Sequence, residues 1–460
     1  MKGIKVYLLL TLMIAGSFVY SQDKAYMLTL EEACEYALQH NKTLLNARDQ
    51  VTVSDKKIFE TIANGLPQVE GSLDYMTYFN YELNLDFGSS SGANLPDFSQ
   101  PPYDMGDAAL FRDIMGLMGS SEPIILNDQL SGNIQVSQLI FSGQYIAGIQ
   151  TAKIARKLAD QSITKSELDI KESVSGSYYT ILITEQTLTI LGENLGNLEL
   201  LLQNTNNLYQ AGVAEETDVD RLKMTVNELK NNEKSLERMN QLNYNMLKFQ
   251  LGVAPETEIV LADSLSQIIE NINLEHALAD SFDISNNINY QLMGSQVEIT
   301  KKQLDLEKWA YAPTIAGFYN YTEKFITTSF DMNPNHLAGF TVSVPIFSSG
   351  IRNSKVAQAK INLDIAQRNR EMLTDQLETQ NKQLLFNYQN ALENYNTQKE
   401  NVAVAKRVYL RVKNKYQQGL VSSFELTQEN SNYLSAESNY LSAVLTLLQA
   451  QIALDKLYNK

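Results

Sequence analysis

The chain has 460 residues, and its 53 acidic side chains outnumber 37 basic ones, which gives a formal net charge of -16. That balance argues against a nucleic-acid partner, because phosphate contacts require clustered lysine and arginine. The single cysteine, Cys34, excludes an intramolecular disulfide framework, so the fold must be held by packing or assembly.

Residues 1–21 have the pattern of a secretory signal peptide. Two lysines precede an apolar stretch from Val6 to Ile14, and a plausible cleavage site precedes Gln22. A membrane anchor helix is the weaker alternative, because the apolar run is short and Gly16 interrupts it. We therefore expect an exported protein. No later segment is apolar for long enough to cross a bilayer as a helix.

The rest of the chain contains a duplicated unit. Tyr209-Gln210-Ala211-Gly212-Val213 recurs 207 positions later as Tyr416-Gln417-Gln418-Gly419-Leu420, each time at the end of a long periodic run. Upstream the offset is 246, as between Pro67 and Pro313, so the first copy carries 39 additional residues. Each copy is predicted to run helix, strand, loop, strand, long helix, tip and helix.

This duplication divides the chain after the signal peptide into segments with predicted boundaries. They are a helical segment at 22–66, a strand hairpin at 67–141 with an extended loop at 81–129, a long helical hairpin at 142–251, a linker at 252–271, a second helical segment at 272–311, a second strand hairpin at 312–347 and a second long helical hairpin at 348–460. The fold class is mainly α with a small β part.

The two long helices are predicted at 143–210 and 350–417. Each is a stretch of 68 residues without proline, which would extend about 100 Å as one helix. Apolar residues recur at heptad spacing, which favours a coiled coil or helical barrel over an ordinary bundle: Leu188, Leu191, Leu195, Leu198 and Leu202. Shorter helices should stack end to end beside them. The summed length of 29–66 and 424–458 is close to that of one long helix, and so is the summed length of 272–310 and 218–251. We therefore expect each of these pairs to stack end to end.

Four strands are predicted, at 68–81, 130–140, 314–323 and 337–347. Four strands are too few to close a membrane barrel, so the chain must oligomerise to remove its sheet edges. Trp309 and Tyr311 precede Pro313 where helix becomes strand. They suit an aromatic belt at a membrane interface, and plain core packing explains them equally well. The 81–129 loop carries a short amphipathic stretch from Leu110 to Met118. It should face outward, where it could cover the mouth of a pore or meet lipid or surface partners.

Residues that would support catalysis or bind a cofactor are not arranged in recognisable motifs. His40, His276 and His336 are far apart, and paired histidines at one helical turn are absent. No glycine-rich phosphate loop follows a strand. We therefore expect a protein that is not an enzyme and that needs neither cofactor nor metal.

Several sequence features together resemble the TolC-type outer-membrane efflux factor family. These features are the signal peptide, Leu28-Thr29-Leu30-Glu31-Glu32-Ala33, the strand entries at Pro67 and Pro313, Val344-Pro345-Ile346-Phe347 and the two tips. The resemblance implies a homotrimer in the cell outer membrane, with four strands per copy in a twelve-stranded β-barrel. It also implies a long periplasmic α-helical barrel continuous with the β-barrel.

The resemblance further assigns roles at the tips. Gly212, Val213, Gly419 and Leu420 correspond to positions where periplasmic adaptor hairpins dock. Asp218 and Glu425 correspond to acidic rings at the entrance, and Tyr209 and Tyr416 to gate aromatics. Gln428 replaces one further family acid and Val421 replaces a family arginine, so a gating salt-bridge network is in doubt. The alternative, from the positions of the residues alone, is that Asp218 and Glu425 are ordinary acids at helix starts, favoured by the helix dipole.

Two functions from different classes follow from these observations. The first is a passive outer-membrane exit channel of a tripartite efflux pump. It would work with a periplasmic adaptor and an inner-membrane transporter of the RND or ABC type, and conduct drugs, other small molecules or type I secreted cargo. The second is a non-conducting structural or adhesive coiled-coil protein of the cell envelope. The paired strand hairpins favour the channel, since a pure scaffold does not need them.

Overall fold

The computed structural model describes residues 26–79, 81–83, 110, 124–126, 128–271, 281–326 and 334–460. The predicted signal peptide, most of the 81–129 loop, including Phe111 to Met118, and His276 lie outside the described residues. The chain forms two compact units. Unit 1 contains residues 1–54, 155–298 and 364–460, and unit 2 contains residues 55–154 and 299–363.

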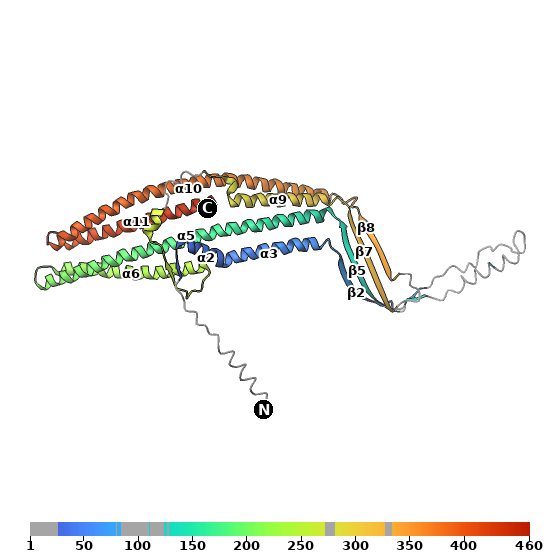
Figure 1. The fold of residues 1–460 in the computed structure, drawn as a ribbon, viewed down its shortest axis with the longest axis horizontal. Helices are drawn as coiled ribbons and strands as arrows, with labels where there is room; N and C mark the ends of the chain where they lie inside the picture. The colour runs from blue at the N-terminus through green and yellow to red at the C-terminus, as the bar shows by residue number, and fades with distance from the viewer. Residues whose placement is uncertain are drawn as a thin grey trace, which may run out of the picture. The chain divides into compact units, whose positions relative to one another are not determined.

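Long helices dominate the described chain (Figure 1). Their bounds are α2 (Leu30–His40), α3 (Lys42–Ala63), α5 (Gly143–Gln210), α6 (Glu216–Leu251), α9 (Ile288–Trp309), α10 (Ile351–Gln417) and α11 (Ser423–Leu457), with the short α7 (Leu265–Asn271) and a 3₁₀ turn, η1 (Ile284–Asn286). The two predicted long helices are confirmed. α10 begins one residue later than expected, because Gly350 adopts a left-handed conformation with φ of 83°.

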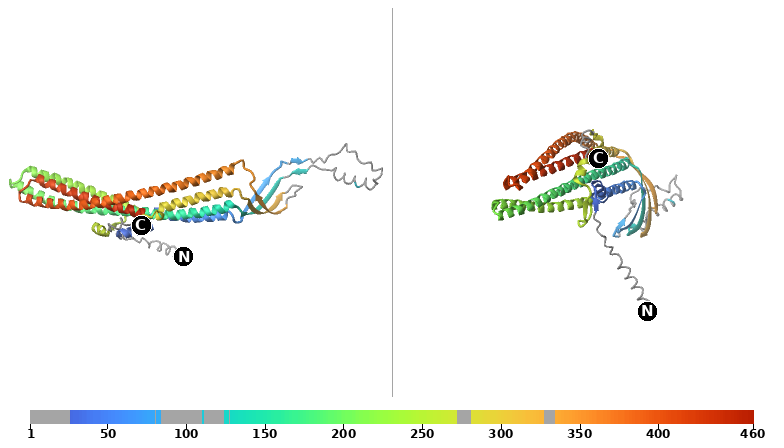
Figure 2. Two further views of the ribbon diagram at one scale, coloured as in Figure 1. Left: turned by 90° about the horizontal axis from the view of Figure 1, so that it is seen from above. Right: turned by 60° about the vertical axis from the view of Figure 1, so that its left-hand side comes forward.

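The heptad residues of α5 form the core between the two helical hairpins of unit 1. Leu191, Leu195 and Leu198 are buried, together with Leu222 of α6 and Leu426 of α11. Residues of α10 complete the same cluster. Four helices therefore bury one shared apolar seam, and three of the predicted heptad leucines of α5 lie in it. Figures 1 and 2 show the α5/α6 and α10/α11 hairpins ending at the same end of the unit.

Two asparagines join the short helices to the ends of α6 and α11. The side-chain amide of Asn41, before α3, donates to the carbonyl of Gln250 near the end of α6 at 2.7 Å. In the second repeat, Asn287 donates to the carbonyl of Leu457, the last residue of α11, at 2.9 Å. Each asparagine also accepts backbone N–H bonds from the helix that follows it, as an N-cap residue does.

These contacts correct the predicted stacking. The segment 29–66 continues from α6 rather than from 424–458, and 272–310 continues from α11 rather than from 218–251. The four short segments have nearly equal lengths, so either pairing fits the length of a long helix. The asparagine contacts decide between them.

The left-handed residue that closes the equivalent helices α6 and α11 is a glycine in the first repeat and an asparagine in the second. Gly252 has a φ of 76°, and a Cβ there would lie 2.5 Å from the carbonyl oxygen of His40. The equivalent Asn459 has a φ of 59°, and its side chain donates to the carbonyl of Asn286, which is the equivalent of His40. The second repeat thus replaces a close backbone approach with a side-chain hydrogen bond.

The 252–271 linker forms a small side structure in unit 1. β6 (Ile259–Leu261) pairs in parallel with β1 (Tyr26–Leu28). The buried hydroxyl of Tyr178, on α5, donates to the carboxylate of Asp263 at 2.9 Å. Asp263 in turn accepts the backbone N–H of Leu30 at 2.7 Å. The start of α2 is therefore fastened to the linker and to α5.

Unit 2 contains one four-stranded antiparallel sheet in the order β2-β5-β7-β8. The strands are β2 (Gln68–Met76), β5 (Gln129–Phe141), β7 (Thr314–Ile326) and β8 (His336–Ser343). β5 and β7 cover the predicted ranges, whereas β2 ends at Met76 instead of 81 and β8 ends at Ser343 instead of 347. The β2/β5 hairpin and the β7/β8 hairpin are joined by antiparallel pairing of β5 with β7, in which Val136 lies opposite Tyr319. A short ladder of β3 (Tyr81–Leu83) and β4 (Ile124–Leu126) lies at the base of the long loop.

The edge strands of the sheet, β2 and β8, are exposed on both faces, whereas most residues of β5 and β7 are half-buried. Every residue of β2 is exposed, and Leu73 is 70% and Phe340 75% accessible. Exposed apolar side chains and edge strands that have no partner among the described residues are typical of a sheet that is completed by another chain. Trp309 is 45% exposed and its ring rests on the backbone of Gly143, which does not decide between an aromatic belt and core packing.

Among the residues that the structure describes, no helix is both long enough and apolar enough to cross a membrane.

Candidate functional site: the two helical tips

Both long helices end at a left-handed glycine. Gly212 has a φ of 74°, and the N–H of Val213 donates to the carbonyl of Leu208 at 2.9 Å. Gly419 has a φ of 70°, and the N–H of Leu420 donates to the carbonyl of Lys415 at 3.0 Å. This six-residue closure is a Schellman motif, which satisfies the last carbonyls of a helix. The tips predicted from the repeated sequence are confirmed.

The helices that leave the tips start differently. The Ser422 hydroxyl caps α11 by accepting the N–H of Glu425 at 3.3 Å. Glu215 occupies the same position before α6 and accepts no side-chain capping bond among the described residues. Asp218 and Glu425 both lie in the first helical turn, where the helix dipole favours a carboxylate. Their placement fits the helix-start interpretation without excluding a ring.

Asp218 and Glu425 nevertheless have different surroundings. Asp218 is half-buried, and its carboxylate accepts a hydrogen bond from the hydroxyl of Ser423 on the other hairpin. Ser423 is 2% exposed. Glu425 is exposed to solvent. Asp218 and Glu425 therefore occupy equivalent positions in the two repeats but do not make equivalent contacts.

The two gate tyrosines differ in the same way. The Tyr416 hydroxyl lies 3.0 Å from the hydroxyl of Thr205, which is buried on α5. Burial, with a smaller contribution from the charge of Asp218, raises the pKa of Tyr416. Tyr209 is 40% exposed. Of the five predicted gate residues, the structure brings Asp218 and Tyr416 together within the chain.

The remaining gate and docking residues point to solvent. Gln428 is exposed, and its amide donates to Asn432 one turn along α11 at 3.2 Å. Val213 is 74% and Leu420 67% exposed, although both are apolar. No described atom would lie within 4 Å of a Cβ at Gly212 or Gly419. The tips therefore present small and apolar groups on open surface.

Contacts between the hairpins include residues that the sequence did not single out. The guanidinium of Arg221 lies 5.2 Å from the ring centre of Phe424. Buried Asn194 donates to buried Asn430 at 2.6 Å, and Lys413 donates to Asn197 at 2.8 Å. The polar residues within the leucine-rich run are the signal that could have indicated these contacts.

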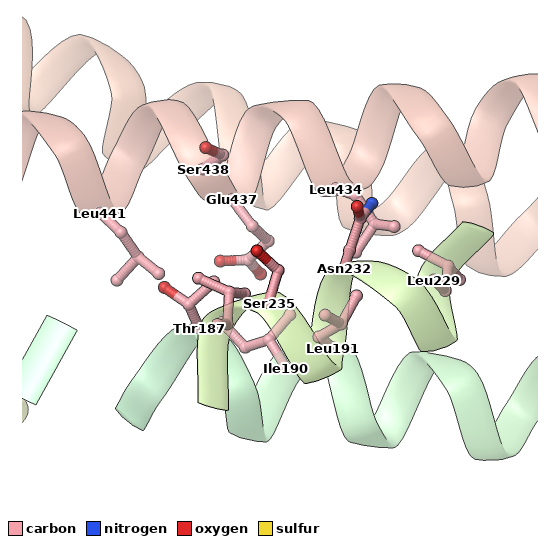
Figure 3. A pocket seen from close by; sticks show the side chains of 11 residues that line it. Thr187, Ile190, Leu191, Leu229, Asn232, Ser235, Leu434, Glu437, Ser438 and Leu441 are labelled. Atoms are coloured by element: carbon pink, nitrogen blue, oxygen red, sulfur yellow. The ribbon is translucent and has the colours of Figure 1, made fainter. Parts of the chain in front are cut away.

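A groove of about 370 Å³ lies along this contact, farther from the tips (Figure 3). Side chains of α5, α6 and α11 line it, with the carboxylate of Glu437 and the hydroxyls of Thr187 and Ser235 among leucines. Among the described residues, no group of three histidine, cysteine or acidic side chains is placed to hold a metal ion.

The family model for outer membrane efflux proteins matches residues 123–253 and 285–460. The chain belongs to this family. The match includes both helical tips and begins just before β4. Membership identifies an outer-membrane transport protein, and the family is one of channels rather than enzymes.

Solved structures of bacterial channel proteins have the same fold. CusC, described in terms of transmembrane channel formation, has a TM-score of 0.71 at 14% identity, with 96% of this chain and 95% of CusC covered. The Campylobacter jejuni outer membrane channel CmeC has a TM-score of 0.69 at 13% identity, covering 96% and 90%. The open state of the Neisseria gonorrhoeae channel MtrE has a TM-score of 0.69 at 15% identity, covering 95% and 93%. No curated protein matches the chain significantly in sequence.

Proposed function

We propose that this efflux-family protein is the passive exit channel of a tripartite pump. Three copies would combine their four-stranded sheets into one twelve-stranded barrel in outer-membrane lipid. Their helical hairpins would form the periplasmic tunnel. The observation that carries this proposal is the sheet of unit 2, whose edge strands β2 and β8 lack partners among the described residues and whose apolar side chains are exposed.

The edge strands explain why one copy is insufficient. A membrane-spanning sheet must satisfy every backbone N–H and carbonyl group, so it has to close on itself. Four strands cannot enclose a lumen, whereas twelve fall within the range of known outer-membrane barrels. Pairing β8 of one copy with β2 of the next would remove both edges. The exposed Leu73 and Phe340 would then face lipid or the lumen.

The tips supply the periplasmic entrance in this proposal. Six tips from three copies would surround the axis, and carboxylates at the narrowest point would favour cations over anions. Glu425 is the better candidate for this role, because Asp218 is already bonded to Ser423 within the chain. Gln428 lies one helical turn beyond Glu425 and adds no charge.

An adaptor protein would dock at the tips. Val213 and Leu420 are apolar and largely exposed, and each follows a glycine without a side chain. An adaptor helical hairpin could therefore approach the backbone closely and cover an apolar residue. Energy would come from an inner-membrane transporter of the RND or ABC type, since the chain carries no nucleotide-binding motif. Drugs, other small molecules and type I secreted polypeptides all remain candidate cargo.

Reconstitution tests this function directly. The full chain purified from outer membranes should run as a heat-modifiable trimer and conduct ions across planar bilayers. Glu425→Ala should lower cation selectivity, whereas Glu256→Ala, in the linker far along the chain from the tips, should leave selectivity unchanged. A trimer that never conducts, even with adaptor present, would support the structural or adhesive alternative. Unchanged selectivity in Glu425→Ala would refute the assignment of that residue alone.

A further inference from the structure

The groove between α5, α6 and α11 combines an apolar lining with one negative charge. Leu191, Leu229 and Leu441 line it and are buried. The carboxylate of Glu437 lies among these side chains (Figure 3). No lysine or arginine of the described chain lines the groove. Its volume of about 370 Å³ is within the range of sites that bind small molecules.

Glu437 lacks the ion pair that its counterpart in the first repeat makes. The offset of 207 residues relates Glu437 to Lys230, and Lys406 to Glu199, so the two repeats carry the same pair of charges with the signs exchanged. In the first repeat, the Nζ atom of Lys230 lies 2.5 Å from the carboxylate of Glu199. In the second repeat, Lys406 is exposed and the carboxylate of Glu437 lies in the groove instead. The half-buried Glu437 therefore has no cationic partner among the described residues.

The polar groups in the groove are placed to accept hydrogen bonds. The buried hydroxyl of Tyr433 donates to the carboxylate of Glu437, and burial followed by this bond raises the pKa of Tyr433. The carboxylate has further lone pairs to offer. Thr187 donates its hydroxyl hydrogen to the carbonyl of Ile183 at 2.7 Å, so this hydroxyl also has only lone pairs left for the groove. Both groups require a ligand that donates.

We propose that this groove binds a small organic cation, with a primary ammonium group against Glu437 and Thr187 and an apolar body against the leucines. An ammonium group has three donors and no acceptor, and its bond to a carboxylate is strengthened by charge. An anion would be repelled by Glu437, and a neutral molecule would leave that charge without a counterion. A metal ion fits less well, because it needs several ligand oxygens where the groove has leucine side chains.

Equilibrium dialysis of the full chain in detergent tests the charge dependence, with protein-free micelles as the blank. The probes are dansylcadaverine, which carries a primary ammonium group, and its neutral hydroxyl analogue. Glu437→Gln should weaken binding of the cation about tenfold. Binding of the neutral analogue should hardly change, because glutamine still accepts a hydrogen bond from its hydroxyl.

Glu429→Gln is the matched control for this measurement. Glu429 lies eight residues earlier on α11 and does not line the groove, so its substitution changes the net charge equally. Binding of both probes should stay at the wild-type level. Equal weakening of the cation by the Glu429 and Glu437 variants, or equal weakening of both probes by Glu437→Gln, would overturn the proposal.

Thr187→Val tests the second contact of the ammonium group. Valine retains the shape of threonine and removes the acceptor, so binding of dansylcadaverine should weaken about threefold. The N-trimethylated derivative keeps its positive charge without N–H donors. Its binding should be unchanged in Thr187→Val but weakened in Glu437→Gln. Equal weakening of both cations by Thr187→Val would refute the role of Thr187 as an acceptor.

Thiol labelling tests the location of the bound probe. Ser438 lines the groove, whereas Ser435 on the same helix does not, and both are exposed. In a Cys34→Ser background, saturating dansylcadaverine should slow maleimide labelling of Ser438→Cys and leave labelling of Ser435→Cys unchanged. Equal rates with and without the probe at both positions would overturn the location. Failure of Ser438→Cys to label even without the probe would show that another protein segment covers the groove, which also refutes the proposal.

The site and the channel function can fail separately, because binding in this groove does not depend on conduction. A protein that binds the cation through Glu437 but never conducts would refute the channel and support the site. A protein that conducts but binds both dansyl probes equally would refute the site and support the channel.

Discussion

Substitution of Gly252 by alanine should destabilise the junction between α6 and α2 more than an equivalent change at a tip. Gly252 and Gly419 have nearly the same backbone conformation, with φ of 76° and 70°. Placing an L-residue in this left-handed region costs about 1–2 kcal/mol at either position. The two sites differ in their surroundings. A Cβ at Gly252 would lie 2.5 Å from the carbonyl oxygen of His40, while no described atom lies within 4 Å at Gly419.

The close approach adds an overpacking cost of about 1–3 kcal/mol at Gly252, because the atom that must move is backbone. We therefore expect Gly419→Ala to lose about 1–2 kcal/mol and Gly252→Ala about 2–5 kcal/mol. Urea unfolding of the detergent-solubilised protein, followed by far-ultraviolet circular dichroism, would measure the difference. Gly252→Asn adds a control, since asparagine tolerates the left-handed region but keeps the Cβ. Equal losses for the two alanine variants would refute the clash.

The other predictions concern the junction asparagines, the single tryptophan and alkaline pH. Asn41→Ala and Asn287→Ala should each lower the free energy of unfolding in urea by about 1–3 kcal/mol, because each variant loses a hydrogen bond to a distant carbonyl and the cap of a helix. A loss of stability at only one of the two sites would contradict their equivalence in the repeat. Gly143→Ala should shift tryptophan fluorescence, since a Cβ would lie 2.2 Å from the indole of Trp309, the chain's only tryptophan; an unchanged spectrum would show that the indole does not rest there. Burial raises the pKa of Tyr179 to about 12. The unfolded chain therefore loses this proton first, and stability should fall as pH rises from about 10 toward 12. Absorbance titration of tyrosinate should show Tyr179→Phe abolishing part of the late transition, and an unchanged titration would contradict the raised pKa.

Much of the tip geometry could be predicted because it is local. A glycine at the end of a periodic run has few structural alternatives, and Gly212 and Gly419 both adopt the left-handed conformation that closes a helix. The positions of the four strands were predictable, and the lengths of α5 and α10 followed from two stretches of 68 residues without proline. The assignments of Glu425 and Gln428 to an entrance stay predictions, since they depend on contacts between copies.

The sequence by itself determined that this protein is a duplicated, mainly helical chain with an incomplete sheet and two glycine tips. It could not determine which short helical segments stack end to end, because the four segments have interchangeable lengths. Asn41 and Asn287 decide this through single hydrogen bonds to carbonyls that are 209 and 170 positions away in the chain. Nor could an internal repeat distinguish Asp218 from Glu425. Only the tertiary structure does so, because the hydroxyl of Ser423 on the other hairpin donates to Asp218, whereas Glu425 is exposed to solvent.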